Sequence, residues 1–164
     1  MAYDDIRQEV VSLVESVTDV GVVHDRQRWA TNWSTLLDLF KHEMSDGSGS
    51  LIRGWMVSRS SILPDTEDSS FGADRELHGF LIRGIMAFSD LEDSEGTFNN
   101  LIDQVRSALI NSARLDAVSS IVVRYARVVS VRLIDIRMFG SVLCHYCELE
   151  YNIETQEGLA FTDV

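Results

Sequence analysis

The chain has 164 residues, of which 45% are apolar and 24% charged, a composition typical of one globular domain with a sizeable core. Its wholly apolar runs are only a few residues long, so we expect no membrane span, and the start MAYDDIRQEV lacks the features of a secretion signal. The 26 acidic and 14 basic residues give a formal net charge of −12, which argues against a broad basic DNA-binding face. We expect a cytoplasmic chain whose two cysteines are reduced thiols.

Two amphipathic helices are predicted in the first 43 residues. The first follows Asp4 or Asp5, either of which could cap it, and ends near Gly21 before a short extended segment, VGVVHD. The second runs from Thr31 to Glu43, with Thr31 or Asn32 as its cap. Their apolar stripes are Ile6, Val10, Leu13, Val14 and Val17 in the first helix and Trp33, Leu36, Leu37 and Phe40 in the second.

The middle of the chain predicts two strands separated by a long loop. A Gly/Ser turn at residues 45–50 precedes a strand at 51–60, and a long exposed loop around 60–74 contains the only proline, Pro64. The strand at 75–88 is apolar on both faces, so we expect it to lie centrally, covered by helices or by another subunit.

The last third of the chain predicts a helix at 94–111, capped by Ser94 or Thr97, and a β-hairpin at 129–154. Gly140–Ser141 fits a two-residue type II′ turn. That turn sets the facing pairs Met138–Leu143, Ile136–His145, Ile134–Cys147, Arg132–Leu149 and Val128–Ile153. The order α-β-α-β-β-α-β-β indicates an α+β fold in a single domain, 1–164, with a mostly antiparallel sheet and helices on one face.

The C-x-x-C at Cys144 and Cys147 raises the question of a metal or redox site. Side chains alternate faces along a strand, so the two thiols point to opposite sides, and we expect Cys147 in the core and Cys144 on the outer face. The other histidines are scattered, and the sequence carries no catalytic motif. We therefore predict no enzyme activity, cofactor or metal. The alternative is a small metal or redox protein that uses Cys144, His145 and Cys147.

The same alternation gathers acidic side chains on the outward face of the last strand. Glu148, Glu150 and Glu154 share that face, and Arg127 and Arg137 on the neighbouring strand should reduce their repulsion. The face is a solvated polar surface, a wall that repels phosphate, or a strand that pairs with a neighbouring subunit.

Several aromatic and loop residues are candidates for subunit or partner contacts. The three tryptophans belong either to the core or to an interface, where aromatic residues are enriched. Loop residues could project towards a partner. The candidate contact residues are Trp29, Trp33, Trp55, Pro64 and Phe71.

Three features together resemble the tail terminator and tail-completion proteins of long-tailed bacteriophages, and more loosely the neck proteins that join head to tail. They are the opening helix IRQEVVSLVESV, the strand HGFLIRGIMAF with its acidic connector and the helix TFNNLIDQVRSALI, and the closing hairpin that ends CELEYNIETQEG. The pattern covers most of the chain. The chain departs from a compact terminator at the long loop 60–74 and at the helix 31–43.

The resemblance implies a structural protein of the virion tail or neck, assembled in the host cytoplasm. A ring, commonly a hexamer, would cap the tail tube, end its polymerisation and dock the head connector. DNA would pass through the lumen without sequence-specific binding, and no membrane would be involved. An acidic surface suits such a channel, in which DNA slides without sticking. The alternative within the same class is a head-closure, adaptor or tail tube subunit.

Overall fold

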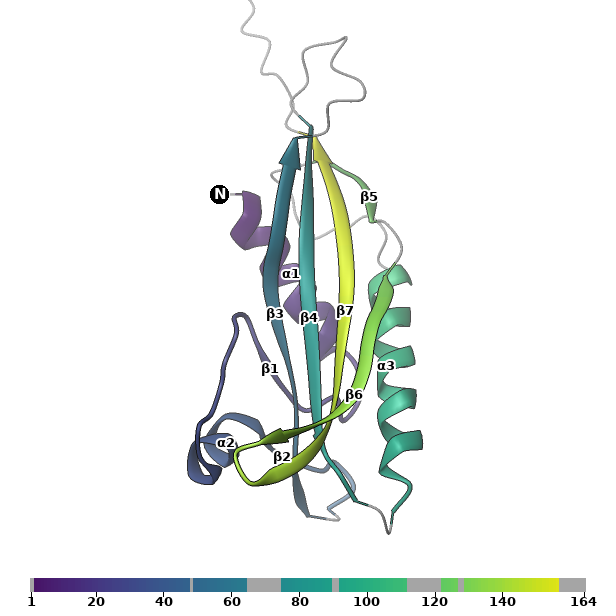
Figure 1. Cartoon of the computed structure of the whole chain (residues 1–164). Coiled ribbons are helices and arrows are strands. Elements are labelled where there is room, and N and C mark those ends of the chain that lie inside the picture. Colours follow the sequence, from purple (N-terminus) through teal and green to yellow (C-terminus); the bar gives the residue numbers. More distant parts are fainter. Residues whose placement is uncertain are drawn as a thin grey trace, which may run out of the picture.

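The computed structural model describes residues 2–47, 49–64, 75–89, 92–111, 122–126 and 129–156 (Figure 1). Within these residues the fold is α+β, as predicted, with three helices and seven strands in a mostly antiparallel mixed sheet. The helices are α1 (Ala2–Glu15), α2 (Trp33–Phe40) and α3 (Ser94–Asn111). The strands are β1 (Val22–His24), β2 (Lys41–Glu43), β3 (Ser50–Pro64), β4 (Arg75–Ala87), β5 (Val122–Ala126), β6 (Ser130–Phe139) and β7 (Val142–Gln156).

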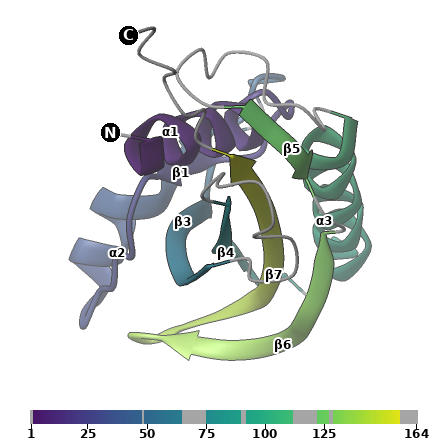
Figure 2. The same cartoon turned by 90° about the horizontal axis from the view of Figure 1, so that it is seen from above.

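The sheet has the strand order β1-β3-β4-β7, and the far edge of β7 is shared by β6 and β5. β1 runs parallel to β3, whereas β3, β4, β7 and the two strands beside β7 pair in antiparallel fashion. The short β2 pairs with the start of β3. β4 is central, as its two apolar faces predicted. Seen along the strands, the sheet is curved and β6 forms its outer edge (Figure 2).

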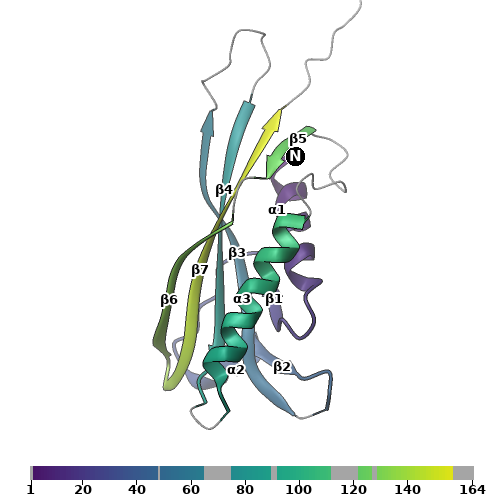
Figure 3. The same cartoon turned by 90° about the vertical axis from the view of Figure 1, so that its right-hand side faces the viewer.

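Helices α1 and α3 cover one face of the sheet and form the main core with it (Figure 3). Trp55 of β3, Phe80 of β4 and Cys147 of β7 lie on this face and are fully buried. The helices contribute Ile6, Val10, Val14, Phe98, Leu101, Val105 and Leu109 to the same cluster. Removal of this apolar surface from water is the main force that holds the layers together.

Helix α2 packs on the opposite face, at one end of the sheet, where it builds a second apolar cluster. Leu36 and Phe40 of α2 lie with Met56 of β3 and Tyr146 of β7 in this cluster. Met56 is adjacent in sequence to Trp55, and successive strand residues point to opposite faces, so the two clusters lie on opposite sides of the sheet. The prediction that the helices cover one face of the sheet therefore holds for α1 and α3. Helix α2 adds a smaller layer on the other face.

Two strand boundaries differ from the sequence prediction. Helix α2 ends at Phe40 because Lys41 takes an extended conformation, and Lys41–Glu43 form β2 instead of a last helical turn. β3 continues to Pro64, so the predicted loop starts later than residue 60. Residues 65–74 of that loop lie outside the described residues.

The helix caps agree with the prediction in one case. Asn32 caps α2, since its side-chain oxygen accepts a hydrogen bond from the amide of Thr35 at 2.9 Å. At α3, Asp93 takes that role by accepting from the amide of Gly96 at 3.1 Å, so the prediction of Ser94 or Thr97 was wrong. The first helix begins at Ala2, which places the predicted caps Asp4 and Asp5 inside its first turn. Acidic side chains are still favourable there, next to the positive end of the helix dipole.

The β6–β7 hairpin has the predicted turn and, close to the turn, the predicted register. Gly140 has a positive φ of 61° and Ser141 does not, as a type II′ turn requires. The pairs Met138–Leu143, Ile136–His145 and Ile134–Cys147 are confirmed. A bulge between Val131 and Leu133 then shifts the register. Beyond it the predicted pairs were wrong, because Val131 lies opposite Leu149 and Ala126 of β5 lies opposite Ile153.

Candidate assembly surface

The predicted acidic face of β7 is largely neutralised by arginines. Glu148 pairs with Arg83 of β4 at 3.4 Å and accepts a hydrogen bond from the hydroxyl of Tyr146 at 2.5 Å. That hydroxyl, with a smaller contribution from Arg83, lowers the pKa of Glu148. Glu150 pairs with Arg132 of β6 at 3.0 Å, and Glu154 is buried. The expectation of a wholly solvated polar face was wrong, because α2 covers the same side of β7 near Tyr146.

Of the predicted pair of arginines, Arg137 contributes to the balance, since its charge helps to lower the pKa of Glu148. Arg137 donates to Asp135 on its own strand at 3.3 Å and lies over the ring of Tyr146, 4.1 Å from its centroid. Arg127 lies outside the described residues. Arg83, on the far side of β7, was missed because the sequence does not reveal that β4 and β7 are neighbours.

Both cysteines are buried, on opposite faces of β7. Cys147 lies in the main core, as predicted, but the expectation that Cys144 lies on an exposed outer face was wrong. Burial raises the pKa of the Cys144 thiol to about 11 and that of Cys147 to about 12. Neither thiol is therefore ionised or accessible enough at neutral pH to act as a nucleophile. Among the residues that the structure describes, no group of three His, Cys, Asp or Glu side chains is placed to hold a metal ion.

The tryptophans divide into one core residue and two surface residues. Trp55 is fully buried, and its Nε1 donates to the carbonyl of Val20 at 3.0 Å, so its assignment as a contact residue was wrong. Trp29 and Trp33 are 50% and 45% exposed. Trp29 stacks on Phe139 of β6, with ring centroids 6.0 Å apart. The backbone of Trp33 lies close to Gly140 at the turn of the β6–β7 hairpin, so both exposed tryptophans belong to segments beside this hairpin.

The other two candidate contact residues are Pro64 and Phe71, which were predicted to lie in the long loop. Pro64 is the last residue of β3, and nothing is described of its side chain. Phe71 lies outside the described residues. Both stay predictions.

Large apolar side chains that the sequence did not single out form an exposed strip along β6. It consists of Ile134, Ile136 and Met138 of β6 with Leu143 of β7, and their exposed fractions are 51%, 47%, 63% and 40%. These side chains point to the α1/α3 side of the sheet, where the pairing pattern placed them, but α3 leaves them exposed. Exposed apolar strips on an outer strand are typical of protein–protein contact sites.

A groove of about 270 Å³ separates this apolar strip from α3. Glu95, Asn99 and Phe98 line it on the helix side, and Ile134, Asp135, Ile136 and His145 line it on the sheet side. His145 is buried at its floor, and its Nε2 lies 2.8 Å from the hydroxyl of Ser94. This Ser–His contact has a structural role, since the same hydroxyl donates to the carbonyl of Ser89 and accepts from its amide, each at 2.9 Å.

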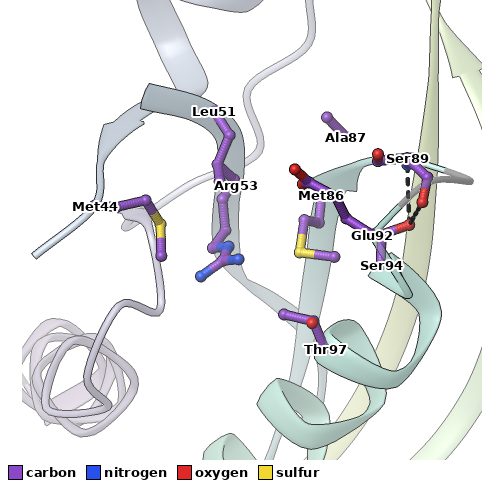
Figure 4. A pocket seen from close by; sticks show the side chains of 9 residues that line it. All are labelled: Met44, Leu51, Arg53, Met86, Ala87, Ser89, Glu92, Ser94 and Thr97. Atoms are coloured by element: carbon purple, nitrogen blue, oxygen red, sulfur yellow. Dashed lines mark hydrogen bonds between the residues drawn. The ribbon is translucent and has the colours of Figure 1, made fainter. Parts of the chain in front are cut away.

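A second pocket, of about 290 Å³, lies between the start of β3 and the N-terminal turn of α3 (Figure 4). The guanidinium of Arg53 points into it between the side chains of Met44 and Met86 (Figure 4). Arg53 is buried, and its Nη1 donates to the carbonyl of Asp19 at 2.8 Å, so it holds the segment after α1 against β3. Glu92 lines the same pocket, and its negative charge disfavours an anionic ligand there.

Comparison with known proteins adds no assignment. The sequence matches no protein-family model, and no curated protein shows significant similarity to it. None of the helices in the described part of the chain is both long and apolar enough to cross a lipid bilayer. The function is therefore inferred from the geometry of the chain. The main feature of its surface is an apolar outer strand with an open edge, beside two exposed tryptophans.

Proposed function

We propose that this chain is a structural subunit of the tail or neck of a long-tailed bacteriophage, and that it assembles into a ring. The ring, in our proposal a hexamer, caps the tail tube, ends its polymerisation and offers a docking surface to the head connector. DNA passes through its lumen without sequence-specific binding. The activity is not chemical and requires no cofactor.

The observation that carries the proposal is the exposed apolar surface made by the β6 strip together with Trp29 and Trp33. A chain that worked alone would leave these large side chains in water at a cost, whereas a subunit buries them against its neighbours. The elements that support the resemblance to tail terminators are the opening helix α1, the long central strand β4 followed by helix α3, and the closing β6–β7 hairpin.

Charge also supports a ring around DNA. The chain carries a net charge of −12, so copies that surround a lumen present a mostly anionic environment to the phosphate backbone. Glu148 and Glu150 remain candidates for its wall, but their ion pairs with Arg83 and Arg132 reduce their individual contribution. In this proposal, repulsion comes from the whole surface and not from one acidic strand.

Another tail or neck subunit is the second candidate, because tube, adaptor and head-closure subunits also need exposed apolar contacts. A tail tube subunit stacks without limit, whereas a terminator stops at one ring. A small metal or redox protein is a weaker alternative, since Cys144 and Cys147 face opposite sides and both are buried.

Negative-stain electron microscopy of the purified chain over a range of concentrations separates these functions. A terminator is expected to form rings of one subunit thickness, with a central hole, that do not lengthen as the concentration rises. Long stacked tubes would favour the tube subunit. Small particles without a hole at every concentration would contradict assembly into a ring.

A further inference from the structure

The outer edge of β6 is open and its backbone is regular. β6 pairs with β7 on one side, and in the described part of the chain no strand pairs with its other side. Between Leu133 and Phe139 the pairing with β7 has no bulge. The free part of β3, on the opposite edge of the sheet, is instead interrupted by a bulge between Arg59 and Ser61, a feature that discourages pairing.

The backbone amide of Ile136 shows which way the unpaired hydrogen-bonding groups of β6 point. It donates to the carboxylate of Asp135 at 2.8 Å, so it points to the open side of the strand and not to β7. In an antiparallel strand, the amide and carbonyl of one residue point to the same side. Ile136 therefore presents one donor and one acceptor to any strand that lies alongside β6.

We propose that β6 pairs with β6 of a second copy of this chain, antiparallel and with Ile136 opposite Ile136 on a two-fold axis. In that register Ile134 faces Met138 of the second copy on the side of the apolar strip. Asp135 faces Arg137 of the second copy on the other side. The segment LIDIRMF is thus self-complementary in both charge and apolarity, which is what an isologous contact requires.

Pairing would exchange contacts that already exist within one chain. Asp135 now accepts from Arg137 at 3.3 Å and from the amide of Ile136. In the pair, the carbonyl of the second copy's β6 replaces Asp135 at that amide, and each carboxylate meets the second copy's guanidinium. No like charges face each other, since Arg132 falls opposite Gly140. The apolar residues at positions 134, 136 and 138 cover one another across the axis.

The self-complementarity is the reason to choose a second copy over a different protein. A strand of another protein would need apolar residues on one face and, on the other face, a positive residue opposite Asp135 and a negative residue opposite Arg137. A second copy of β6 has this pattern already. The inference goes beyond the proposed ring, because a two-fold contact alone gives a dimer. Rings need another contact, for which Trp29 and Trp33 are available, and two-fold contacts would then join rings or precede them.

Charge reversal tests the pairing in a way that a folding defect cannot imitate. Asp135→Arg gives a strand with two positive positions, and Arg137→Asp gives one with two negative positions. Each variant alone places like charges opposite each other at two positions and should self-associate at least about fivefold more weakly than the wild type. An equimolar mixture restores both opposite-charge pairs and should form heterodimers.

The measurement is sedimentation equilibrium of each variant and of the mixture, with circular dichroism melts to show that each variant is folded. Ile136→Pro provides a second variant, since it removes the outward amide while a proline is tolerated on the free side of an edge strand. It should also abolish pairing. Self-association of the single variants at the wild-type level, no gain in the mixture, or a wild type that is monomeric throughout would overturn the pairing. Wild-type rings without two-fold pairing through β6 would overturn only this inference, and dimers without rings only the proposed function.

Discussion

The ring of Phe40 lies against the backbone of Gly54. A Cβ added to this glycine would stand 2.6 Å from Cδ1 of Phe40 and 2.6 Å from the carbonyl oxygen of Val22. The close approach of both α2 and β1 to β3 therefore depends on a residue without a side chain. Phe40 is the central aromatic residue of the second apolar cluster, so this contact positions α2 and, with it, Trp33 at its first turn.

Gly54→Ala is expected to destabilise the fold by about 1–3 kcal/mol, the usual cost of forcing extra atoms into a packed site. Part of the clash is with backbone, which cannot rotate away. The free energy of unfolding from urea titration measures the effect. Ser107→Ala, at an exposed position of α3, is the matched control and should change stability by less than about 0.5 kcal/mol. Equal stability of the two variants would contradict the packing described for α2.

His78 should make stability depend on pH. Its Nδ1 lies 3.2 Å from Nη2 of Arg59, which can only donate, so Nδ1 accepts and Nε2 carries the proton towards Thr155 at 3.1 Å. Burial lowers the pKa of His78, and Glu76 opposes that effect only in part. Because the folded-state pKa lies below the unfolded value near 6.5, the unfolded chain takes up the proton first as the pH falls.

Stability from His78 is thus present above about pH 6.5 and is lost below it, at no more than about 1.4 kcal/mol per pH unit. Urea titrations at pH 7.5 and 5.5 check this. His78→Gln removes the titrating group, so its stability should fall less between the two pH values than that of the wild type. His145, whose pKa is also lowered by burial, remains in both proteins. A wild type that gains stability at pH 5.5 would contradict the neutral, buried state of His78.

The two thiols should be inert in the folded chain. With pKa values raised to about 11 and 12 and no exposed surface, Cys144 and Cys147 should not react with a thiol reagent such as dithionitrobenzoate at pH 8. In 6 M guanidinium chloride both should react within minutes. Fast labelling of either cysteine in the native protein would show that β7 opens, and would revive the metal or redox alternative.

The sequence carried enough information for the hairpin and for the central strand. Gly140–Ser141 specified a two-residue turn, and alternating apolar residues on both sides of it fixed the register as far as Ile134. The bulge after Val131 has no comparable signal, since Arg132 is as acceptable in a regular strand as in a bulged one. The two apolar faces of β4 likewise predicted a central strand, although they did not predict which strands are its neighbours.

What covers each face could not be predicted, because it depends on contacts between distant segments. Glutamates at alternate positions suggested that one side of β7 is solvated, but α2, more than 100 residues earlier, covers Tyr146 on that side. The reverse holds at β6, where α3 leaves apolar residues exposed. The apolar strip of the candidate assembly surface therefore consists of the apolar residues of β6 that the rest of the chain does not bury.

Light scattering after size-exclusion chromatography tests the central claim, that exposed apolar residues drive self-assembly, most directly. The wild type should elute as a closed oligomer, six times the chain mass of 18.5 kDa for a hexamer, at a mass that does not grow with concentration. The double variant Trp29→Ser with Trp33→Ser should lower that mass while Trp55, in the core, is unchanged and keeps the fold intact. A wild type that stays at 18.5 kDa up to high concentration would contradict the account.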